Sequence, residues 1–487
     1  MSTKKILAVL LALFVLATAV SGCGNSGSSS ADSQSGSSAT SENSASTEDT
    51  ASTDGEVPTI SLMVVCGTTP PDADAVAEKL SEITREKIGC NVEFITMEIG
   101  NVAQQLNLLL SGGDDTLDVF MAGISVPYST IVNNGQALSL DTLMEPYAEE
   151  VKTALGEKVY ESGRVNGELY GIGRLLDQAS TTCYNLRRDI AEEFGYKNGD
   201  KVDLAELTEL FGKVREKYPD TPLIGPMNGV PSIGDSRIDS LGNKLGVLDN
   251  YGQDTTVTNY YESAGYEELV GYFKQWKEMG CYMADILNVT DAPIDYIPSG
   301  KAFGCFASHF SAEMNGIWSS QNFGTDIASL QIYEDAVAIT PGAYECINPA
   351  TKNPEAAAAL IYLMATDPDV ENLLINGIEG QHYQVLEDNT ATYVDGKDIS
   401  TTGWCLGYSW TALNSTISIP FEYPADYYDR MLAANKNAQQ SKAFGCQFDL
   451  TGVSDAVSAC TNVVNQYENA LSGGAVEDFD ATLAQFQ

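Results

Sequence analysis

The chain has 487 residues, with 26 Lys and Arg against 67 Asp and Glu, so its formal net charge is −41. This length exceeds one ordinary domain and predicts two or three. The 43% hydrophobic content is enough for packed cores and excludes a chain that is disordered overall. The excess of acids excludes a nucleic-acid-binding protein, which needs a basic surface, and binding to anionic lipid through a basic patch.

The N-terminus carries the pattern of an export signal. Lys4 and Lys5 precede an uncharged, mostly apolar run over 6–20, which is short for a membrane-spanning helix. The run ends in Val20-Ser21-Gly22-Cys23, which resembles the lipobox of bacterial lipoproteins. We expect residues 1–22 to be removed as a signal peptide and Cys23 to carry acyl chains such as palmitate, because two or more chains anchor a protein stably. The alternative is an ordinary secretory signal followed by an incidental cysteine.

Residues 23–56 are predicted to form a tether between the lipid and the folded body. The segment 24–56 contains 12 Ser among 33 residues, six acids, no Lys or Arg and no aromatic residue. Such a composition buries too little apolar surface to offset chain entropy, so we expect disorder and a reach on the order of 30 Å. The predicted location is the outer side of the cell membrane. The body from Val57 onward keeps 24 bases and 61 acids, a net charge of −37.

Nine cysteines remain after Cys23. No CxxC motif occurs, and neither of the two histidines stands near a cysteine with metal-ligand spacing, so no metal site and no cofactor are predicted. Several of these cysteines lie in apolar segments, such as Cys66 at the end of Leu62 to Cys66. A thiol serves there as a small hydrophobe, so we expect mostly free, buried thiols.

The first part of the body alternates strands and helices. The pattern predicts strands over 59–66, 91–97 and 117–121, and helices that begin at Asp72 and at Val102. This order predicts a parallel, doubly wound sheet, in which ligands bind beyond the carboxyl ends of the strands. The loops 67–72 and 122–128 therefore form a candidate site. Further helices are predicted over 204–218 after Asp203, from Pro354 after Asn353, and from Pro368 to Gly377.

Several segments in the same order resemble the extracellular solute-binding proteins of ABC importers, family 1, in particular the subgroup that handles sugars and oligosaccharides. The resemblance rests on the segments Leu117 to Phe120, Gly135 to Asp141, Gly167 to Ile172, Arg188 to Ile190, Thr351 to Ala356, Gly377 to Tyr383 and Ala443 to Asp449. The ordered agreement extends over roughly 57–480.

The resemblance implies an α/β fold of two lobes, each a mostly parallel sheet flanked by helices, joined by hinge strands and closing over a ligand. We assign 57–181 and 338–400 to lobe 1, and 182–337 and 401–487 to lobe 2. The implied function is a receptor, expected to be a monomer, that captures a carbohydrate and delivers it to the transmembrane subunits of an ABC permease.

Aromatic faces, acids, amides and imidazoles are the groups that sugar binding requires. Seven residues are ligand-binding candidates: Thr68, Tyr128, Asp177, His309, Trp404, Tyr408 and Trp410. Thr68 and Tyr128 lie on the switch-point loops, and alternation places the three aromatic residues of 404–410 on one side of an extended segment. The structural alternatives are a buried aromatic core, a solvated loop acid at Asp177 and a structural histidine at His309. His382 stands in a family motif and is interpreted as structural.

No catalytic motif in the sequence supports an enzymatic function. The sequence contains no GxSxG, HExxH or GxxxxGK[ST], and nothing singles out a carboxylate pair for glycoside hydrolysis. We predict that the protein is not an enzyme. Two other hypotheses stay open, a receptor of the same fold for peptides or other solutes and a cell-surface glycan-degrading enzyme.

Overall fold

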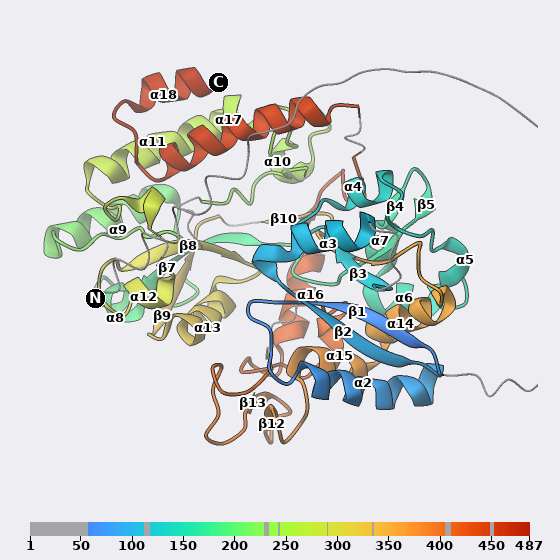
Figure 1. The fold of residues 1–487 in the computed structure, drawn as a ribbon. Helices are drawn as coiled ribbons and strands as arrows, with labels where there is room; N and C mark the ends of the chain where they lie inside the picture. The colour runs from blue at the N-terminus through green and yellow to red at the C-terminus, as the bar shows by residue number, and fades with distance from the viewer. Residues whose placement is uncertain are drawn as a thin grey trace, which may run out of the picture. The chain divides into compact units, whose positions relative to one another are not determined.

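The computed structural model describes residues 57–111, 117–227, 233–241, 244–289, 291–333, 336–404, 411–448 and 452–487, and Figure 1 shows their arrangement. Residues Glu56–Gln487 form one compact unit. The predicted signal peptide, the lipidation site Cys23 and the tether lie outside the described residues. In the described part of the chain, no helix combines the length and the apolar character needed to cross a bilayer.

The first sheet has five strands in the order β2-β1-β3-β11-β6. They are β1 (Thr59–Cys66), β2 (Asn91–Glu98), β3 (Val119–Ala122), β6 (Gly171–Gly173) and β11 (Tyr344–Ile347). Strand β1 pairs in parallel with both β2 and β3, which confirms the predicted strand-helix alternation. Strand β11 runs antiparallel to both β3 and β6. Four of the five strands therefore run in one direction, and this sheet is mostly parallel.

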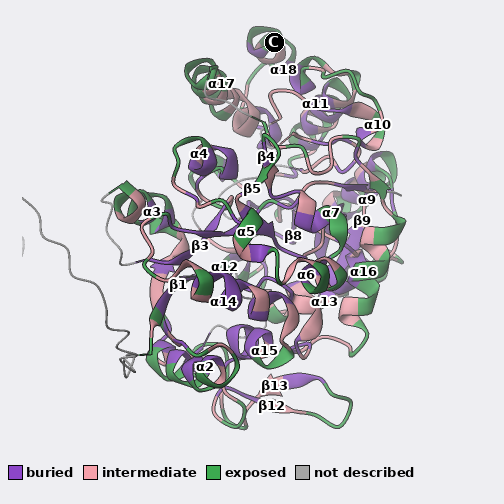
Figure 2. Ribbon diagram, turned by 90° about the vertical axis from the view of Figure 1, so that its right-hand side faces the viewer, coloured by how far each residue is buried: buried purple, intermediate pink, exposed green. Residues whose placement is uncertain are grey.

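Helices cover both faces of this sheet because side chains alternate along β1. Ile60, Leu62 and Val64 enter the core that contains α2 (Ala73–Ile88), α14 (Pro354–Thr366) and α15 (Pro368–Asn376). Met63 and Val65 face the opposite core, to which α3 (Val102–Ser111) contributes. Figure 2 shows buried residues on one side of α2 and exposed residues on the other. The helices starting at Asp72, Val102, Pro354 and Pro368 are confirmed.

The second sheet has three strands in the order β8-β7-β9, namely β7 (Thr181–Arg187), β8 (Gly304–His309) and β9 (Ile327–Gln331). Here the expectation of a mostly parallel sheet in each lobe is wrong, because β7 pairs antiparallel with both neighbours. Strands β8 and β9 do run in the same direction, with helix α13 (Ala312–Phe323) between them in the chain. The central position between them is occupied by β7, which runs the opposite way.

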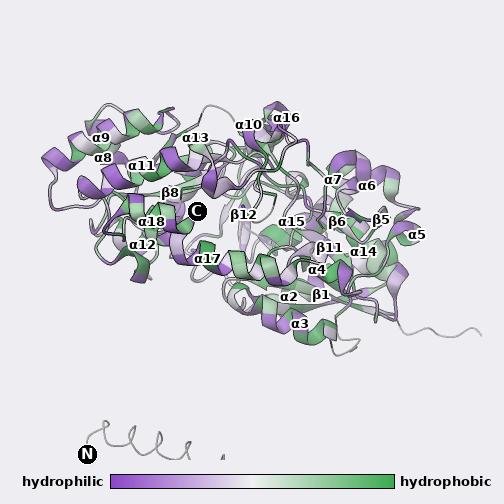
Figure 3. Cartoon of the chain, turned by 90° about the horizontal axis from the view of Figure 1, so that it is seen from above, coloured by the Kyte–Doolittle hydropathy of each residue, from purple (hydrophilic) through white to green (hydrophobic). Residues whose placement is uncertain are grey.

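The core of this second region is built around large aromatic side chains. Tyr184 from β7 packs against Phe211 and Phe306, and Trp276 packs against the same two rings. The helices that contribute are α8 (Arg188–Glu193), α9 (Leu204–Lys217), α11 (Ala264–Glu278), α17 (Ser454–Ser472) and α18 (Phe479–Phe486). Helix α9, predicted with Asp203 as its cap, begins with that carboxylate accepting from Glu206 N. Its hydrophilic and hydrophobic residues alternate in Figure 3.

The remaining elements are short. They are α4 (Tyr128–Asn133), α5 (Asp141–Met144), α6 (Ala148–Leu155), α7 (Glu157–Glu161), α10 (Asp249–Gly252), α12 (Pro293–Tyr296), α16 (Tyr427–Asn437), η1 (Ile99–Asn101), η2 (Tyr260–Glu262), η3 (Ile286–Asn288), η4 (Ser415–Ile417), and the strand pairs β4 (Arg164–Val165) with β5 (Glu168–Leu169), β10 (Val337–Ala338) with β14 (Gln439–Gln440) and β12 (Tyr383–Val385) with β13 (Ala391–Tyr393). Strand β10 lies between β9 and β11 in the chain, and β14 follows α16. Their pairing joins two segments that connect one large sheet with the other.

The chain passes between the regions around the two large sheets after β6, which is followed by β7, and after β9, which is followed along the chain by β10 and β11. Trp404 and Leu413 belong to the core of the first sheet, and Phe421 packs with Tyr383 and Ala391. The described residues 402–404 and 411–421 thus pack with the first sheet, whereas the proposed division placed 401–487 in lobe 2. The exact lobe limits stay a prediction.

Eight of the nine body cysteines lie in the described part of the chain, and these eight are free. Six are buried, namely Cys66, Cys90, Cys183, Cys281, Cys305 and Cys346, whereas Cys446 and Cys460 are exposed. Burial raises the pKa of the Cys305 thiol to about 12, so this sulfur stays protonated and packs as a small hydrophobic group.

Candidate functional site

The two switch-point loops lie at the same edge of the first sheet. Strands β1 and β3 are parallel neighbours, so the loops after Cys66 and after Ala122 leave the sheet at their carboxyl ends. Thr68 is exposed on the first of these loops, and Thr69 N donates to Glu98 Oε1 at 3.4 Å. An exposed hydroxyl at this edge is available to a ligand, and Thr68 stays a predicted contact.

Tyr128, on the second loop, is enclosed by the protein. It is 3% exposed, and its hydroxyl donates to Gly163 O at 2.5 Å. Its ring stacks on Tyr344 with 4.1 Å between centroids. Burial raises the pKa of Tyr128, so the phenol stays neutral. The polar atom is thus used within the protein, and the structure gives Tyr128 a packing role beside the sheet edge; a ligand contact there stays a prediction.

Trp404 is also a core residue, with 5% of its surface exposed. Its Nε1 donates to Leu374 O at 3.3 Å, and its ring stacks on Phe94. Tyr408 and Trp410, the other two residues of the predicted aromatic cluster, lie outside the described residues. The segments on either side of them reach the end of β1, because Asp72 N donates to Gly403 O at 3.2 Å and Val65 N donates to Thr411 Oγ1 at 3.1 Å.

His382 holds the first switch-point loop in place. Its Nδ1 accepts from Ile378 N at 2.9 Å, which leaves the proton on Nε2, and Nε2 donates to Asp72 Oδ2 at 3.1 Å. Gln381 donates to the same oxygen at 3.0 Å. The ring is fully buried, and burial lowers the pKa of His382. Its hydrogen bonds are complete, in agreement with the structural interpretation of this histidine.

Asp177 and His309, two candidates from distant parts of the sequence, meet around one aromatic side chain. His309 ends strand β8, and its ring contacts Tyr427 of α16, with 6.4 Å between centroids. Asp177 lies on the connection between β6 and β7, close enough to Tyr427 for its charge to act on the phenol. Burial raises the pKa of Tyr427, and the neighbouring charges of Tyr423 and Asp177 add to that rise.

The polar atoms of Asp177 and His309 are not used up by the protein. Ser311 N donates to His309 Nδ1 at 3.4 Å, so the proton of the neutral ring is on Nε2, and no described residue accepts from it. Burial lowers the pKa of His309 to about 4, so the ring is neutral at physiological pH. Burial raises the pKa of Asp177 to about 6, and no Lys or Arg of the described chain pairs with its carboxylate. One donor and one carboxylate are therefore open to a ligand.

Aromatic rings complete this arrangement. Tyr423 stacks on Tyr427 with 4.0 Å between centroids, and Phe310 meets Tyr427 edge to face at 5.3 Å. Both tyrosines are half-buried. Flat aromatic faces beside an acid and an imidazole donor are the groups that contact the C–H surface and the hydroxyls of a sugar. We name Asp177, His309, Phe310, Tyr423 and Tyr427 the aromatic–acid cluster.

Tyr423 and Tyr427 are not among the binding residues predicted from the sequence. The signal available was the run Tyr423-Pro424-Ala425-Asp426-Tyr427-Tyr428, in which three tyrosines stand within six residues at the start of a helix. Tyr428 turns away, with its hydroxyl 3.0 Å from Ser418 Oγ. Only the fold shows that two of the three lie beside His309 and Asp177.

Helix α16 is fixed to both regions of the molecule. Asn435 Nδ2 donates to Leu176 O at 2.7 Å, and Ala179 N donates to Asn435 Oδ1 at 3.1 Å, so α16 is tied to the connection that carries Asp177. Met431 packs with Phe310 and Met314. The aromatic–acid cluster thus lies where the chain crosses between the two regions, which is where a hinge-closing receptor would hold its ligand.

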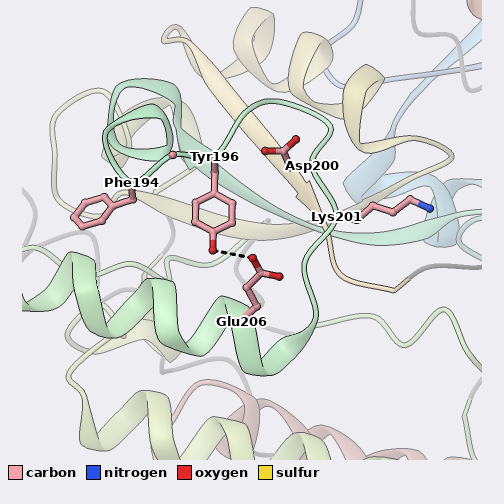
Figure 4. A pocket seen from close by; sticks show the side chains of 6 residues that line it. Phe194, Tyr196, Asp200, Lys201 and Glu206 are labelled. Atoms are coloured by element: carbon pink, nitrogen blue, oxygen red, sulfur yellow. Dashed lines mark hydrogen bonds between the residues drawn. The ribbon is translucent and has the colours of Figure 1, made fainter.

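Three surface depressions lie elsewhere. One of about 420 Å³ is lined by residues that include Phe194, Tyr196 and Glu206, and Figure 4 shows the Tyr196 hydroxyl directed at Glu206, to which it donates at 3.0 Å. A second, of about 350 Å³, lies between 277–288 and 473–475. A third, of about 450 Å³, lies between 158–162 and 440–445. None of these three includes a residue of the aromatic–acid cluster.

Within the described ranges, no group of three or more His, Cys, Asp or Glu side chains is arranged to hold a metal ion. The aromatic–acid cluster itself consists of hydrogen-bonding groups and aromatic rings.

Known proteins resemble this chain over most of its length. A "Carbohydrate ABC transporter substrate-binding protein" of Streptococcus pneumoniae is 22% identical over 440 residues, covering 88% of this chain and 86% of the relative. Residues 442–487 match a family described as a domain of unknown function, DUF3502. These residues include α17 and α18 of the second region.

Solved structures show the same fold. The N-glycan transport solute binding protein (NgtS) of Streptococcus pneumoniae superposes with a TM-score of 0.75 at 19% identity, covering 88% of this chain and 94% of the other. Its complex with Man1GlcNAc gives 0.70 at 20% identity and the same coverage. A solute-binding protein of Bifidobacterium longum subsp. infantis gives 0.59 at 16% identity, covering 90% and 96%. The resemblance predicted from the sequence is thereby confirmed: the chain has the two-lobed fold of the solute-binding proteins and is similar in sequence to a carbohydrate-type substrate-binding protein of an ABC transporter.

Proposed function

We propose that this protein is the substrate-binding component of an ABC importer, which captures a carbohydrate, an oligosaccharide in particular, and delivers it to the permease. The observation that carries the proposal is the aromatic–acid cluster at the crossing between the lobes. The relatives support it, because one is described as a carbohydrate substrate-binding protein and NgtS has been solved with Man1GlcNAc and with Man5GlcNAc.

The proposed mechanism is closure of the two lobes on the ligand. Asp177 lies on one connecting segment, His309 at the end of a strand of the second sheet, and Tyr427 on a helix tied to both regions. The loops 67–72 and 122–128 belong to the first sheet. A ligand that contacts both sets of groups binds the closed state better than the open one, so binding shifts the population toward closure.

Calorimetry with purified protein tests this function. A panel of mannose- and N-acetylglucosamine-containing oligosaccharides is titrated in parallel with oligopeptides, and X-ray scattering follows the radius of gyration. We expect micromolar or tighter binding of an oligosaccharide together with compaction. Tight binding of a peptide without binding of any sugar would overturn the ligand class. Cleavage of an oligosaccharide during the titration, detected by mass spectrometry, would instead identify a glycan-degrading enzyme.

The lipid anchor is a separate part of the proposal. Cleavage before Cys23 and acylation of its thiol would hold a monomeric receptor on the outer side of the membrane, with residues 24–56 as the tether. Expression of the full chain with a Cys23→Ala substitution should move the protein from the membrane fraction to the medium. Intact-mass analysis of the unmodified chain tests the anchor directly, and a mature chain without acyl chains on Cys23 would contradict it.

A further inference from the structure

We propose that the aromatic–acid cluster selects uncharged sugars and discriminates against oligosaccharides that carry a carboxylate, with Asp177 as the residue that determines this specificity. The inference rests on the proposed carbohydrate-binding function and adds a chemical class to it. It follows from the charges that surround Asp177.

Asp177 lies on the connection that Asn435 ties to α16, and no Lys or Arg of the described chain acts on its carboxylate. It is half-buried beside Tyr427, and its negative charge adds to the effect of burial on that phenol. His309, the other titratable group of the cluster, is neutral at physiological pH for the reason given above and brings no positive charge. A second carboxylate, brought by a ligand, would face repulsion that is strong because the site is partly desolvated.

The cations of the neighbouring elements are engaged elsewhere. Arg430 of α16 pairs with Asp426 at 2.8 Å and with Glu313 of α13 at 3.0 Å. Lys436 lies nine residues beyond Tyr427 on the same helix, which places it on the opposite side and about 13 Å along the axis. Arg174 is buried on the same connection as Asp177, and its guanidinium is directed at Ala412 O and Met121 Sδ.

The other charges near the crossing add little positive potential. Lys158 and Lys442 line the depression between 158–162 and 440–445, where Lys158 donates to Gln440 and Glu161 supplies an acid. The internal segments outside the described residues are 112–116, 228–232, 242–243, 290, 334–335, 405–410 and 449–451, and their sequences contain no Lys or Arg. A ligand carboxylate would therefore meet Asp177 in a body that already carries a net charge of −37.

A neutral hydroxyl fits the same groups well. The carboxylate of Asp177 accepts two hydroxyl hydrogens, His309 Nε2–H donates to a ring or hydroxyl oxygen, and the stacked tyrosines contact the C–H face. None of these contacts requires charge on the ligand. The cluster thus matches hexoses and N-acetylhexosamines, and it lacks the arginine fork that commonly recognises a carboxylate.

The test compares two forms of one oligosaccharide. Man5GlcNAc, or the neutral glycan that binds best in the panel, is titrated beside its counterpart in which one terminal C6 hydroxymethyl group is oxidised to a carboxylate. At pH 7.5 and low salt we expect the acidic form to bind at least 30-fold more weakly. Asp177→Asn should reduce that ratio to about 3-fold, and 0.5 M NaCl should reduce it in the unmodified protein, because salt screens charge repulsion.

A matched control is Asp426→Asn, which removes an exposed acid paired with Arg430 on the same helix and should leave the ratio unchanged. Thermal unfolding verifies that both variants fold. Equal affinities of the two glycans, or a ratio that Asp177→Asn leaves unchanged, would overturn the inference while the proposed function stands. Failure of every glycan to bind would overturn both.

Discussion

The two histidines of the chain provide the most informative comparison in the molecule. Both are neutral, because burial lowers the pKa of each, and both accept a backbone N–H at Nδ1. They differ at Nε2: in His382 this atom donates to Asp72, whereas in His309 it has no described partner. The first histidine is part of the framework that holds a loop, and the second presents a donor to the aromatic–acid cluster.

The comparison shows that a missing partner is informative only where a ligand can reach the group. Glu345 of β11 also lacks hydrogen-bond partners at both carboxylate oxygens, yet it is fully buried within the first lobe's core layers, on a strand of the first sheet. Burial raises the pKa of Glu345 and of its neighbour Glu371 to about 8. These acids affect stability and lie out of reach of a ligand, whereas His309 and Asp177 are only half-buried.

The largest expected effect is on stability, from His382→Ala. The substitution removes a fully buried ring and leaves Ile378 N–H and the Asp72 carboxylate without their partner. We expect the free energy of unfolding to fall by about 3 kcal/mol. Denaturant unfolding at pH 7.5 measures this loss. His309→Ala is the matched comparison. Apart from the lost packing of the ring, it should lower the free energy of unfolding by less than about 1 kcal/mol, because the hydrogen bond from Ser311 N to His309 Nδ1 is long. Equal losses of unfolding free energy in the two variants would contradict the different roles assigned to the two histidines.

The next effect is a pH dependence caused by Glu345. Its pKa is raised from an ordinary 4.5 to about 8, so the folded state keeps a proton that the unfolded chain releases. The resulting contribution to stability is complete below pH 4.5 and is lost as the pH rises through 8. As the pH rises from 5 to 8, Glu345→Gln should lose less stability than the unmodified protein, by roughly 3 kcal/mol.

Glu355→Gln, at an exposed position of α14, is the control for the removal of one acid. In this control variant, the free energy of unfolding should depend on pH in the same way as in the unmodified protein. Parallel curves for Glu345→Gln and the unmodified protein would contradict the assignment of this slope to the buried carboxyl.

A smaller effect is expected on ligand affinity from His309→Phe. The substitution keeps an aromatic ring beside Tyr427 and removes the Nε2 donor. Loss of one hydrogen bond should weaken glycan binding about 10-fold. The free energy of unfolding should change by less than about 0.5 kcal/mol. Undiminished affinity, measured by calorimetry with the glycan identified in the panel, would show that the donor does not face the ligand.

The smallest effect is spectroscopic. Because the chain has two histidines, its ring proton resonances are assigned by His309→Phe alone. We expect His309 to titrate near pH 4 and His382 below its ordinary value of 6.5. Both lowered pKa values contribute stability above pH 6.5 that is lost as the pH falls toward 4. Saturating glycan should shift the His309 resonance and leave that of His382 in place; the reverse would exchange their roles.

Local sequence patterns were sufficient to predict many of the helices and strands, and the class of fold. Strand β1 was predicted at Thr59–Cys66, and the helices at Asp72, Asp203, Pro354 and Pro368 begin where capping residues and proline indicate. Those signals are local, because periodicity, caps and proline act within a few residues. The resemblance to solute-binding proteins also came from ordered motifs that the sequence displays.

Long-range packing brings together polar groups that no local sequence pattern relates. Asp177, His309 and Tyr427 come from three distant segments, and no local rule relates them. The central antiparallel position of β7 depends likewise on long-range pairing. The sequence does not show whether Trp404 and Tyr128 are exposed or buried. In the folded chain, the packing around the first sheet encloses both side chains. Burial and hydrogen-bond completion are properties of the assembled chain, so the difference between the two histidines appears only there.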